Sequence, residues 1–344
     1  MTFSQKRLPK SQIALEVKLD PEEVANHRPK AIEALVKGLQ IEGFRPGHIP
    51  LSIAEKHLGD AVILEEAARL AIGEAYVGIV KQENFDVIGE PEVQVMKLAQ
   101  GNPLEFRVQV AVLPNVELGD YKKIAGQSSR KKVAVEEQEV EKTLEWLRES
   151  RKTKDGLSSK DVIPELTNEF AQGMGNFKDL ESLRASIKEG MQYEKEGQEK
   201  ERLRQEIIEK VADQSKLEIP DVLVEREKNV LLSQIKQGVA QTLQISFEEY
   251  LKNTKKTEKE IFDSFAKEAE QRVKRFLVMR EIAAREKIGP TREEVEREMN
   301  TILEHYKNAQ QGRQKLDEGR LWEYTEGVLR HEKTLQFLEQ FASL

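Results

Sequence analysis

The sequence predicts an α+β protein that is predominantly α, with a small N-terminal α+β domain followed by an elongated, all-helical body. Two stretches of the first 113 residues alternate apolar and polar side chains, which is the period of a strand with one buried face. From Ile163 onward the pattern is helical and highly charged. Charged residues make up 34% of the 344 residues and apolar residues 38%, a balance that suits long solvated helices better than one compact globule.

The first predicted strand contains the alternating apolar residues Ile13, Leu15, Val17 and Leu19. It stops at Asp20, which is a good helix N-cap, and Pro21 suits the first position of a helix. Glu23 stands where a capping box needs a carboxylate. A helix should follow, with a kink or a late start at Pro29.

The next predicted feature is an exposed, constrained loop, because two Gly and two Pro in eight residues cannot continue a helix. It consists of Gly43, Phe44, Arg45, Pro46, Gly47, His48, Ile49 and Pro50. A second helix is expected from about Asp60 to Lys81, followed by strands near Glu92–Leu98 and Leu104–Leu113. The predicted order is therefore strand, helix, loop, helix, strand, strand.

The remaining chain is predicted to be almost entirely helical. After a turn-rich exit over Pro114–Gly126, a charged helix is expected over Val133–Lys154, with Val140, Leu144 and Leu147 as its apolar stripe. A capping box of Thr291 and Glu294 predicts a helix start just after Pro290. Because no heptad pattern is sustained, we expect an extended helical body and not a coiled coil. Its helices are expected near residues 179–214, 221–243, 257–287 and 291–310.

Several classes of function are disfavoured by what the sequence lacks. It has no cysteine, which excludes disulfides, thiolate catalysis and cysteine-containing zinc sites. Its five histidines show no metal-binding spacing, and no phosphate-binding or nucleophile motif is present. We therefore expect no enzyme activity, no cofactor and no metal.

The charge and hydropathy of the chain indicate its surroundings. A net charge of −7 argues against coating nucleic acid by bulk charge. No apolar run approaches the ~18 residues of a membrane span, and the first eight residues lack the apolar core of a secretory signal. We expect a soluble, cytoplasmic protein with no membrane contact.

The 43–50 segment is the one dense candidate for a binding site. A loop tip gains nothing from exposing Phe44 unless a partner buries it, and Arg45 can contact carboxylate or phosphate in a planar, bidentate manner. Within residues 24–57, five basic residues outnumber three acidic ones. These residues favour a docking loop, because Arg and aromatic residues are enriched at interface hot spots, with an ordinary helix–helix turn as the alternative.

The motif Gly43-Phe44-Arg45-Pro46-Gly47-His48-Ile49-Pro50 resembles the G-F-R-x-G-x-x-P signature of the trigger factor family, bacterial chaperones at the ribosomal exit tunnel. The opening strand, the flanking helices and Pro114–Leu118 resemble that family's ribosome-binding domain. Pro164–Phe170 and Leu217–Pro220 are similar to parts of its C-terminal domain. The resemblance implies a ribosome-binding domain at 1–115, a linker with a long helix at 116–159 and a helical chaperone domain with arms at 160–344.

One departure from the family is visible. The usual member carries an FKBP-like prolyl isomerase domain before the Pro164–Phe170 segment, whereas only about ten residues separate the linker helix from that segment here, against roughly 50 for a small independent domain. The isomerase domain is therefore expected to be absent, and with it the activity.

The function implied by the resemblance is that of an ATP-independent holdase. Its expected partners are the ribosome, through the 43–50 segment that touches protein and rRNA at the tunnel exit, and unfolded or nascent polypeptides; a homodimer off the ribosome is left open. Two alternatives stay open: an RNA-binding or ribosome-associated module without chaperone activity, and a periplasmic chaperone of the survival-protein type.

Overall fold

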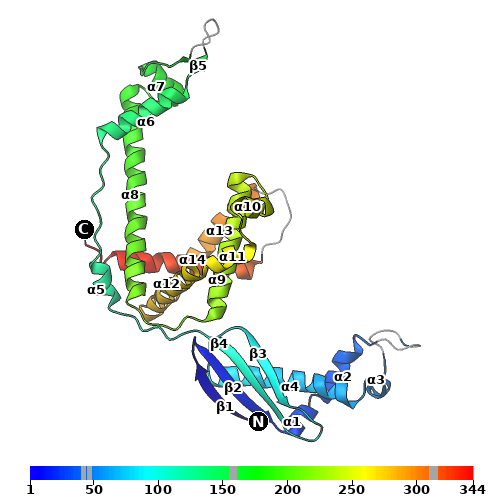
Figure 1. The fold of residues 1–344 in the computed structure, drawn as a ribbon. Coiled ribbons are helices and arrows are strands. Elements are labelled where there is room, and N and C mark those ends of the chain that lie inside the picture. Colours follow the sequence, from blue (N-terminus) through cyan, green and yellow to red (C-terminus); the bar gives the residue numbers. More distant parts are fainter. Residues whose placement is uncertain (40–43, 45–48, 155–160, 310–316, 344) are drawn as a thin grey trace. The chain divides into compact units, whose positions relative to one another are not determined.

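The computed structural model describes residues 1–39, 44, 49–154, 161–309 and 317–343 (Figure 1). The chain forms two compact units. The first combines Met1–Glu117 with Lys216–Phe276, and the second combines Leu118–Ser215 with Leu277–Leu344. The domain boundaries predicted after residues 115 and 159 stay predictions.

A four-stranded antiparallel sheet forms the first part of unit 1, in the order β1-β2-β4-β3. The predicted strands are present: the one at residues 13–19 is β2, and those near 92–98 and 104–113 are β3 and β4. In the register of β2 against β4, Leu15 lies opposite Val108 and Val17 opposite Phe106. The strands are β1 (Thr2–Leu8), β2 (Gln12–Leu19), β3 (Val87–Lys97) and β4 (Leu104–Val112).

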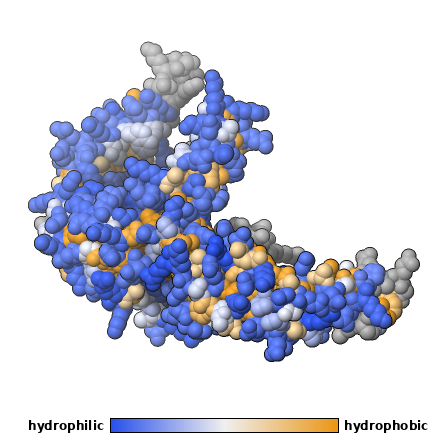
Figure 2. Space-filling model, turned by 60° about the horizontal axis from the view of Figure 1, so that its bottom comes forward, coloured by the Kyte–Doolittle hydropathy of each residue, from blue (hydrophilic) through white to orange (hydrophobic). Residues whose placement is uncertain are grey.

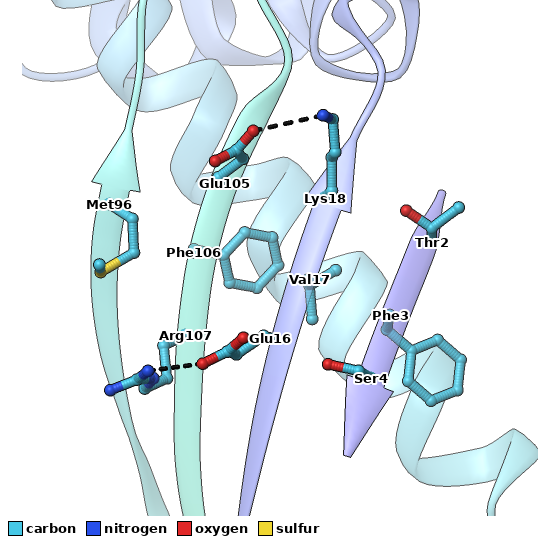
Figure 3. Close-up of a pocket in the computed structure, with 10 residues that line it drawn as sticks. All are labelled: Thr2, Phe3, Ser4, Glu16, Val17, Lys18, Met96, Glu105, Phe106 and Arg107. Atoms are coloured by element: carbon cyan, nitrogen blue, oxygen red, sulfur yellow. Dashed lines mark hydrogen bonds and ion pairs between the residues drawn. The ribbon is translucent and has the colours of Figure 1, made fainter. Parts of the chain in front are cut away.

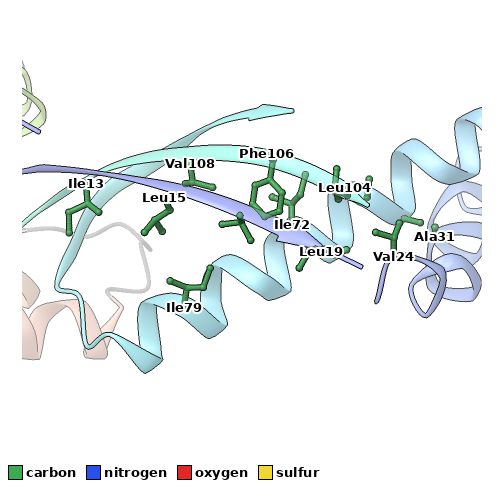
Figure 4. Packing of buried hydrophobic residues seen from close by; sticks show 14 residues of the cluster. Ile13, Leu15, Leu19, Val24, Ala31, Ile72, Ile79, Leu104, Phe106 and Val108 are labelled. Carbon is green, nitrogen blue, oxygen red and sulfur yellow. The ribbon is translucent and has the colours of Figure 1, made fainter. Parts of the chain in front are cut away.

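The core of this part lies between the sheet and helix α4 (Asp60–Gln82), which crosses one face of the sheet (Figure 4). Apolar residues at alternate positions of β2 and β4 are buried, with only Val112 at the end of β4 partly exposed, so the alternation seen in the sequence marks the face that contacts α4. Small residues of α4, among them Ala67, Ala68 and Ala71, are buried against this cluster and allow close packing.

Strand β1 was not predicted, because Thr2–Leu8 does not alternate. It is an edge strand, and of its seven residues only Phe3 and Leu8 are even half-buried. A strand with so little buried surface leaves no periodic signal. Its position follows from pairing with β2, in which Gln5 lies opposite Leu15.

The helices around the 43–50 segment differ in part from expectation. The capping carboxylate of Glu23 accepts a hydrogen bond from the backbone N–H of Asp20 at 2.8 Å, as predicted. The helix expected after Pro21 is two helices, α1 (Pro21–Ala25) and α2 (Arg28–Val36), with Pro29 in the first turn of α2. Helix α3 (Leu51–Leu58) was not predicted, because eight residues are too few for periodicity to identify.

Strand β3 is longer than predicted and irregular. Its pairing with β4 shifts register between Ile88 and Glu92, where Gly89 has a φ of +75°. Pro91 stands in this bulge, which is one of the places where a strand tolerates proline.

The helical part of unit 1 runs from α9 into α12. The predicted helix at 221–243 is α9 (Asp221–Gly238) continued by a π-helical turn (Val239–Leu243). The single helix expected at 257–287 is instead α11 (Glu258–Ser264) and α12 (Ala266–Arg285), divided at Phe265 without any Gly or Pro to mark the break. Helix α10 (Phe247–Thr254) begins at the N-cap Ser246, where a break was expected.

Unit 2 contains the longest helix, α8 (Leu180–Asp213), close to the predicted 179–214. Helix α6 (Glu137–Ser150) is shorter than the predicted 133–154, although Val140 and Leu144 are buried as expected. The expected turn-rich exit contains a helix, α5, that begins at the N-cap Asp120. The other elements of this unit are α5 (Tyr121–Gly126), β5 (Thr153–Lys154), β6 (Asp161–Val162), α7 (Asn168–Met174), α13 (Arg292–Ala309) and α14 (Glu318–Glu339).

Ion pairs fasten the helices of unit 2 to one another. Lys188 and Lys195 of α8 contact Glu137 and Glu139 of α6 at 2.5 and 2.6 Å. Arg204 of α8, only 8% exposed, contacts Glu332 of α14 at 2.7 Å and also Glu339. The partly or fully exposed lysine pairs contribute little to stability, whereas the buried Arg204 pairs join α8 to α14 beside the apolar core.

The start of α13 matches the predicted capping box. The Thr291 N–H donates to the Glu294 carboxylate at 2.7 Å, and the Glu294 N–H donates to the Thr291 hydroxyl at 3.3 Å.

Candidate functional site

The 43–50 segment joins α2 to α3, and three of its eight residues are described: Phe44, Ile49 and Pro50. The other five predicted site residues lie outside the described residues: Gly43, Arg45, Pro46, Gly47 and His48. Phe44 and the anchored end of the segment at Ile49 and Pro50 are therefore the described parts of this candidate site.

Ile49 anchors the end of the segment. It is 5% exposed and packs in a small apolar cluster, here called the corner cluster, which is separate from the core under the sheet. The next residue starts α3, because the Pro50 carbonyl accepts hydrogen bonds from the N–H groups of Ile53 and Ala54 at 2.9 and 3.0 Å. The buried members of the corner cluster are Ile32, Val36, Ile49, Ala54 and Ile63.

Arg28 ties the three helices of this corner together. Its guanidinium contacts Glu55 of α3 at 2.6 Å and Asp60 of α4 at 2.7 Å. Hydrogen bonds to Asp60 and then Glu55 raise the pKa of Arg28. Arg28 is one of the five basic residues counted near the segment, so its charge is already balanced within the fold.

Phe44 lies at the surface of the segment with 37% of its side chain exposed. Exposing a phenyl ring to water is unfavourable, so an exposed Phe44 is suited to contact with a partner. Lys30, Lys37 and Lys56, the other basic residues of the 24–57 stretch that the structure describes, make no ion pair with another described residue.

The open face of the sheet offers a different surface. A pocket of about 430 Å³ lies there, between β1, β2, β4 and Met96 of β3 (Figure 3). Two ion pairs cross it, Arg107 with Glu16 at 2.5 Å and Lys18 with Glu105 at 3.4 Å. These four charges are therefore already paired with one another within the fold.

The helical part of unit 1 carries an apolar groove of about 470 Å³, here called the elbow groove. The groove was not predicted from the sequence, although apolar residues recur at every fourth position of α9 and the π-helical turn and so share one side of the helix. The apolar and aromatic residues that line the groove are Leu231, Ile235, Val239, Leu243, Tyr250 and Phe265.

Several apolar residues of the helical body are candidates for adaptable contact with a client, and the structure distinguishes buried ones from exposed ones. Leu277 and Met279 are buried, at 2% and 3% exposure, and belong to the core. Phe276 is 61% exposed and Phe265 lines the elbow groove, so both are available at the surface. Phe262 lies under the ammonium of Lys228, whose Nζ is 4.0 Å from the ring centre.

The strongly shifted ionisable groups lie at helix contacts and not in a pocket. Arg202 lowers the pKa of Glu199 to about 2. Burial, followed by a hydrogen bond to Glu286, raises the pKa of Tyr121 to about 12. Within the described ranges, no three His, Cys, Asp or Glu side chains are grouped as metal ligands would be. These shifted groups take part in contacts that stabilise the fold.

The same part of the chain contains no helix long and apolar enough to cross a membrane.

Comparison with known proteins extends these observations. The family model "Bacterial trigger factor protein (TF)" matches residues 1–147, and "Bacterial trigger factor protein (TF) C-terminus" matches residues 179–340. Neither model describes residues 148–178, the region where the sequence departs from the usual domain order.

Curated relatives match along almost their whole length. The trigger factor of Caldicellulosiruptor bescii is 23% identical, with 100% of this chain and 97% of the relative covered. That of Carboxydothermus hydrogenoformans is 26% identical, with 99% of each covered. Both alignments run over more than 420 residues, against 344 in this chain, so each relative has stretches without a counterpart here.

A solved structure shares the fold. It is described as "Promiscuous Substrate Recognition in Folding and Assembly Activities of the Trigger Factor Chaperone", and it superposes with a TM-score of 0.59 at 20% identity, covering 99% of both chains. With both terminal family models, the curated relatives and the fold in agreement, this chain belongs to the trigger factor family.

Proposed function

We propose that this chain is an ATP-independent holdase that docks beside the ribosomal exit tunnel through the 43–50 segment and shields nascent polypeptides with its helical body. Membership of the trigger factor family makes it a ribosome-associated chaperone that binds the ribosome and nascent chains. The alternatives, an RNA-binding module and a periplasmic chaperone, are not favoured by these matches. The finer assignments to particular residues, and a location in the cytoplasm, are our proposals.

Docking is assigned to Gly43, Phe44, Arg45, Pro46, Gly47, His48, Ile49 and Pro50. The observation that carries this assignment is the contrast between Ile49, 5% exposed in the corner cluster, and Phe44, 37% exposed. The buried Ile49 fixes the point at which the segment enters α3, and the exposed Phe44 ring is accessible to a partner. Arg45 supplies a guanidinium that suits carboxylate or phosphate at the ribosome surface.

Client holding is assigned to apolar surface on the helical body. The elbow groove and the exposed ring of Phe276 offer separate contacts, and Figure 2 shows apolar residues reaching the surface among hydrophilic ones. Several weak contacts along one flexible chain add up to useful affinity, yet each releases quickly. That combination allows binding and release without nucleotide.

The test of the docking assignment is co-sedimentation with ribosomes. If both residues are hot spots, Phe44→Ala and Arg45→Ala should each cost about 2 kcal/mol or more, so the double variant should no longer co-sediment. Phe276→Ala is the matched control, because it also removes an exposed phenyl ring, and it should bind ribosomes like the unchanged protein. Wild-type occupancy by the double variant would refute the docking assignment.

Two further proposals concern what the chain does not do and how it associates. We propose that it lacks prolyl isomerase activity, since only the N- and C-terminal models of the family match it. A homodimer off the ribosome stays a prediction, and light scattering across a range of concentrations would test it.

A further inference from the structure

The outer edge of β3 is an open strand edge in the part of the chain that the structure describes. In the sheet order β1-β2-β4-β3, strand β3 pairs with β4 on one side, and no other described strand pairs with its outer side. Such an edge presents backbone N–H and C=O groups that can pair with another chain. The segment Glu92–Lys97, after the bulge, is called the β3 edge below.

The β3 edge carries fewer of the features that prevent strand addition than the rest of the sheet's perimeter does. It has the exposed charges Glu92 and Lys97 and a second register shift between Val95 and Lys97, but from Glu92 to Val95 its pairing with β4 is regular and contains no proline. The opposite edge, β1, carries the exposed charges Lys6 and Arg7. The first half of β3 is broken by the register shift after Ile88 and contains Pro91, which cannot donate a hydrogen bond. Charge, proline and bulges are the usual means of preventing strand addition.

Apolar side chains are exposed along the β3 edge. Val93, Val95 and Met96 are 46%, 47% and 60% exposed. By register Val93 lies opposite Val108, and Val95 lies opposite Phe106. Both partners are buried, so the two valines continue the apolar face of the sheet to its last strand and remain half uncovered there. An added strand with apolar residues at alternate positions would cover them.

The charges beside the edge indicate what else such a strand should carry. Glu90 and Glu92 make no ion pair with another described residue, and neither does Lys97 at the C-terminal end of β3. The near end of the edge is therefore acidic, and a basic residue in the added strand would find an opposite charge there.

The length of the edge decides between a client and a second copy of this chain. Six residues of strand span about 20 Å, and pairing over that length covers much less than the roughly 800 Å² per partner of a stable interface. A contact this small is too weak to hold a dimer alone. It is sufficient for a client that is held at other points as well.

We propose that the β3 edge binds an extended segment of an unfolded polypeptide, apolar at alternate positions and flanked by a basic residue, as a fifth strand of the sheet. This rests on the proposed chaperone function and adds a backbone-directed client site on the N-terminal part of the chain. Recognition through backbone groups depends little on client sequence, which suits a chaperone with many clients.

The test uses the full chain and a labelled peptide in which valine alternates with threonine between two terminal lysines. Fluorescence anisotropy should show binding, and N-methylation of alternate peptide nitrogens should abolish it. Val95→Lys should weaken binding about tenfold or more, because it places a charge on the apolar face of the edge. Gln5→Lys is the matched control: it lies on the same face at the opposite edge of the sheet, opposite Leu15, and should leave binding unchanged.

Hydrogen exchange provides a readout that does not depend on the folding of a variant. The peptide should slow exchange of the amides of residues 92–97 in the unchanged protein. Binding without such protection, or equal binding of the N-methylated peptide, would overturn the proposal. The proposal would also be overturned if the amides of residues 92–97 became protected without peptide as the protein concentration rose, and if Val95→Lys removed that protection. A second copy of the chain would then occupy the edge.

Suppression of aggregation of a denatured protein separates this inference from the proposed function. If the unchanged chain suppresses aggregation but the peptide does not protect the β3 edge, only the edge assignment fails. If the unchanged chain gives no suppression at several-fold excess, the holdase function itself fails.

Discussion

Replacing Ile49 by alanine tests whether the 43–50 segment depends on a buried anchor. Ile49 is 5% exposed in a cluster of five buried residues, with Leu35, Leu39 and Leu58 packed around it. Truncating a buried Ile to Ala costs about 2–5 kcal/mol, and the lower end applies where the surroundings can collapse into the space. Because this cluster is small and lies near the surface, we expect a loss of about 2–3 kcal/mol.

Native-state hydrogen exchange measures this loss locally. Amides of α3 should exchange roughly 30- to 150-fold faster in Ile49→Ala, since each 1.4 kcal/mol is a factor of ten in the opening equilibrium. Amides of β2 and β4 should change little, because their core is a separate cluster. Ribosome affinity should fall only in proportion to the fraction of molecules in which this corner remains folded.

Ile53→Ala is the matched control, because the same side chain is removed from the same corner at a position 39% exposed. It should cost about 0.5 kcal/mol or less. Ile49→Val should restore most of the protection, at a cost of about 0.5–1.5 kcal/mol. If Ile49→Ala and Ile53→Ala exchange at the same rate, Ile49 is not the anchor and the reasoning is wrong.

Three further predictions follow from the helical body. A fragment of residues 160–344 should fold poorly, because Leu183 would lose its packing partners in α6. A fragment of residues 116–344 keeps those partners, so it should fold and suppress aggregation. Thermal melting followed by circular dichroism compares the two fragments, and equal melting temperatures would contradict the packing argument. The pKa of Glu199 is about 2 in the folded chain against an ordinary 4.5, so its contribution to stability is present above pH 4.5 and is lost as the pH falls toward 2. The free energy of unfolding of Glu199→Gln should therefore fall less steeply with pH in that window. An unchanged slope would mean that the pairing with Arg202 does not stabilise the fold. A proline-containing peptide should isomerise at the background rate in the presence of the purified chain, and catalysis that persists through purification would contradict the domain assignment.

Local signals in the sequence determined much of the fold. The alternation at Ile13–Leu19 located β2 and its buried face, and the box of Thr291 and Glu294 located the start of α13. Both signals depend on residues only a few positions apart, and such interactions hold wherever the segment lies. The motif at 43–50 likewise indicated the family, which the comparisons confirmed.

Other features were decided only by contacts between residues distant in the sequence. Strand β1 is a strand because it pairs with β2, and α11 ends at Ser264 without a local break signal. Arg28 had been counted as free positive charge, but it is balanced by Glu55, 27 positions away, and by Asp60. Leu277 and Met279 are buried, whereas Phe276 beside them is exposed. Composition and periodicity describe each segment by itself, so they cannot tell which charge is already paired or which apolar side chain another helix covers; only the tertiary structure brings those partners together.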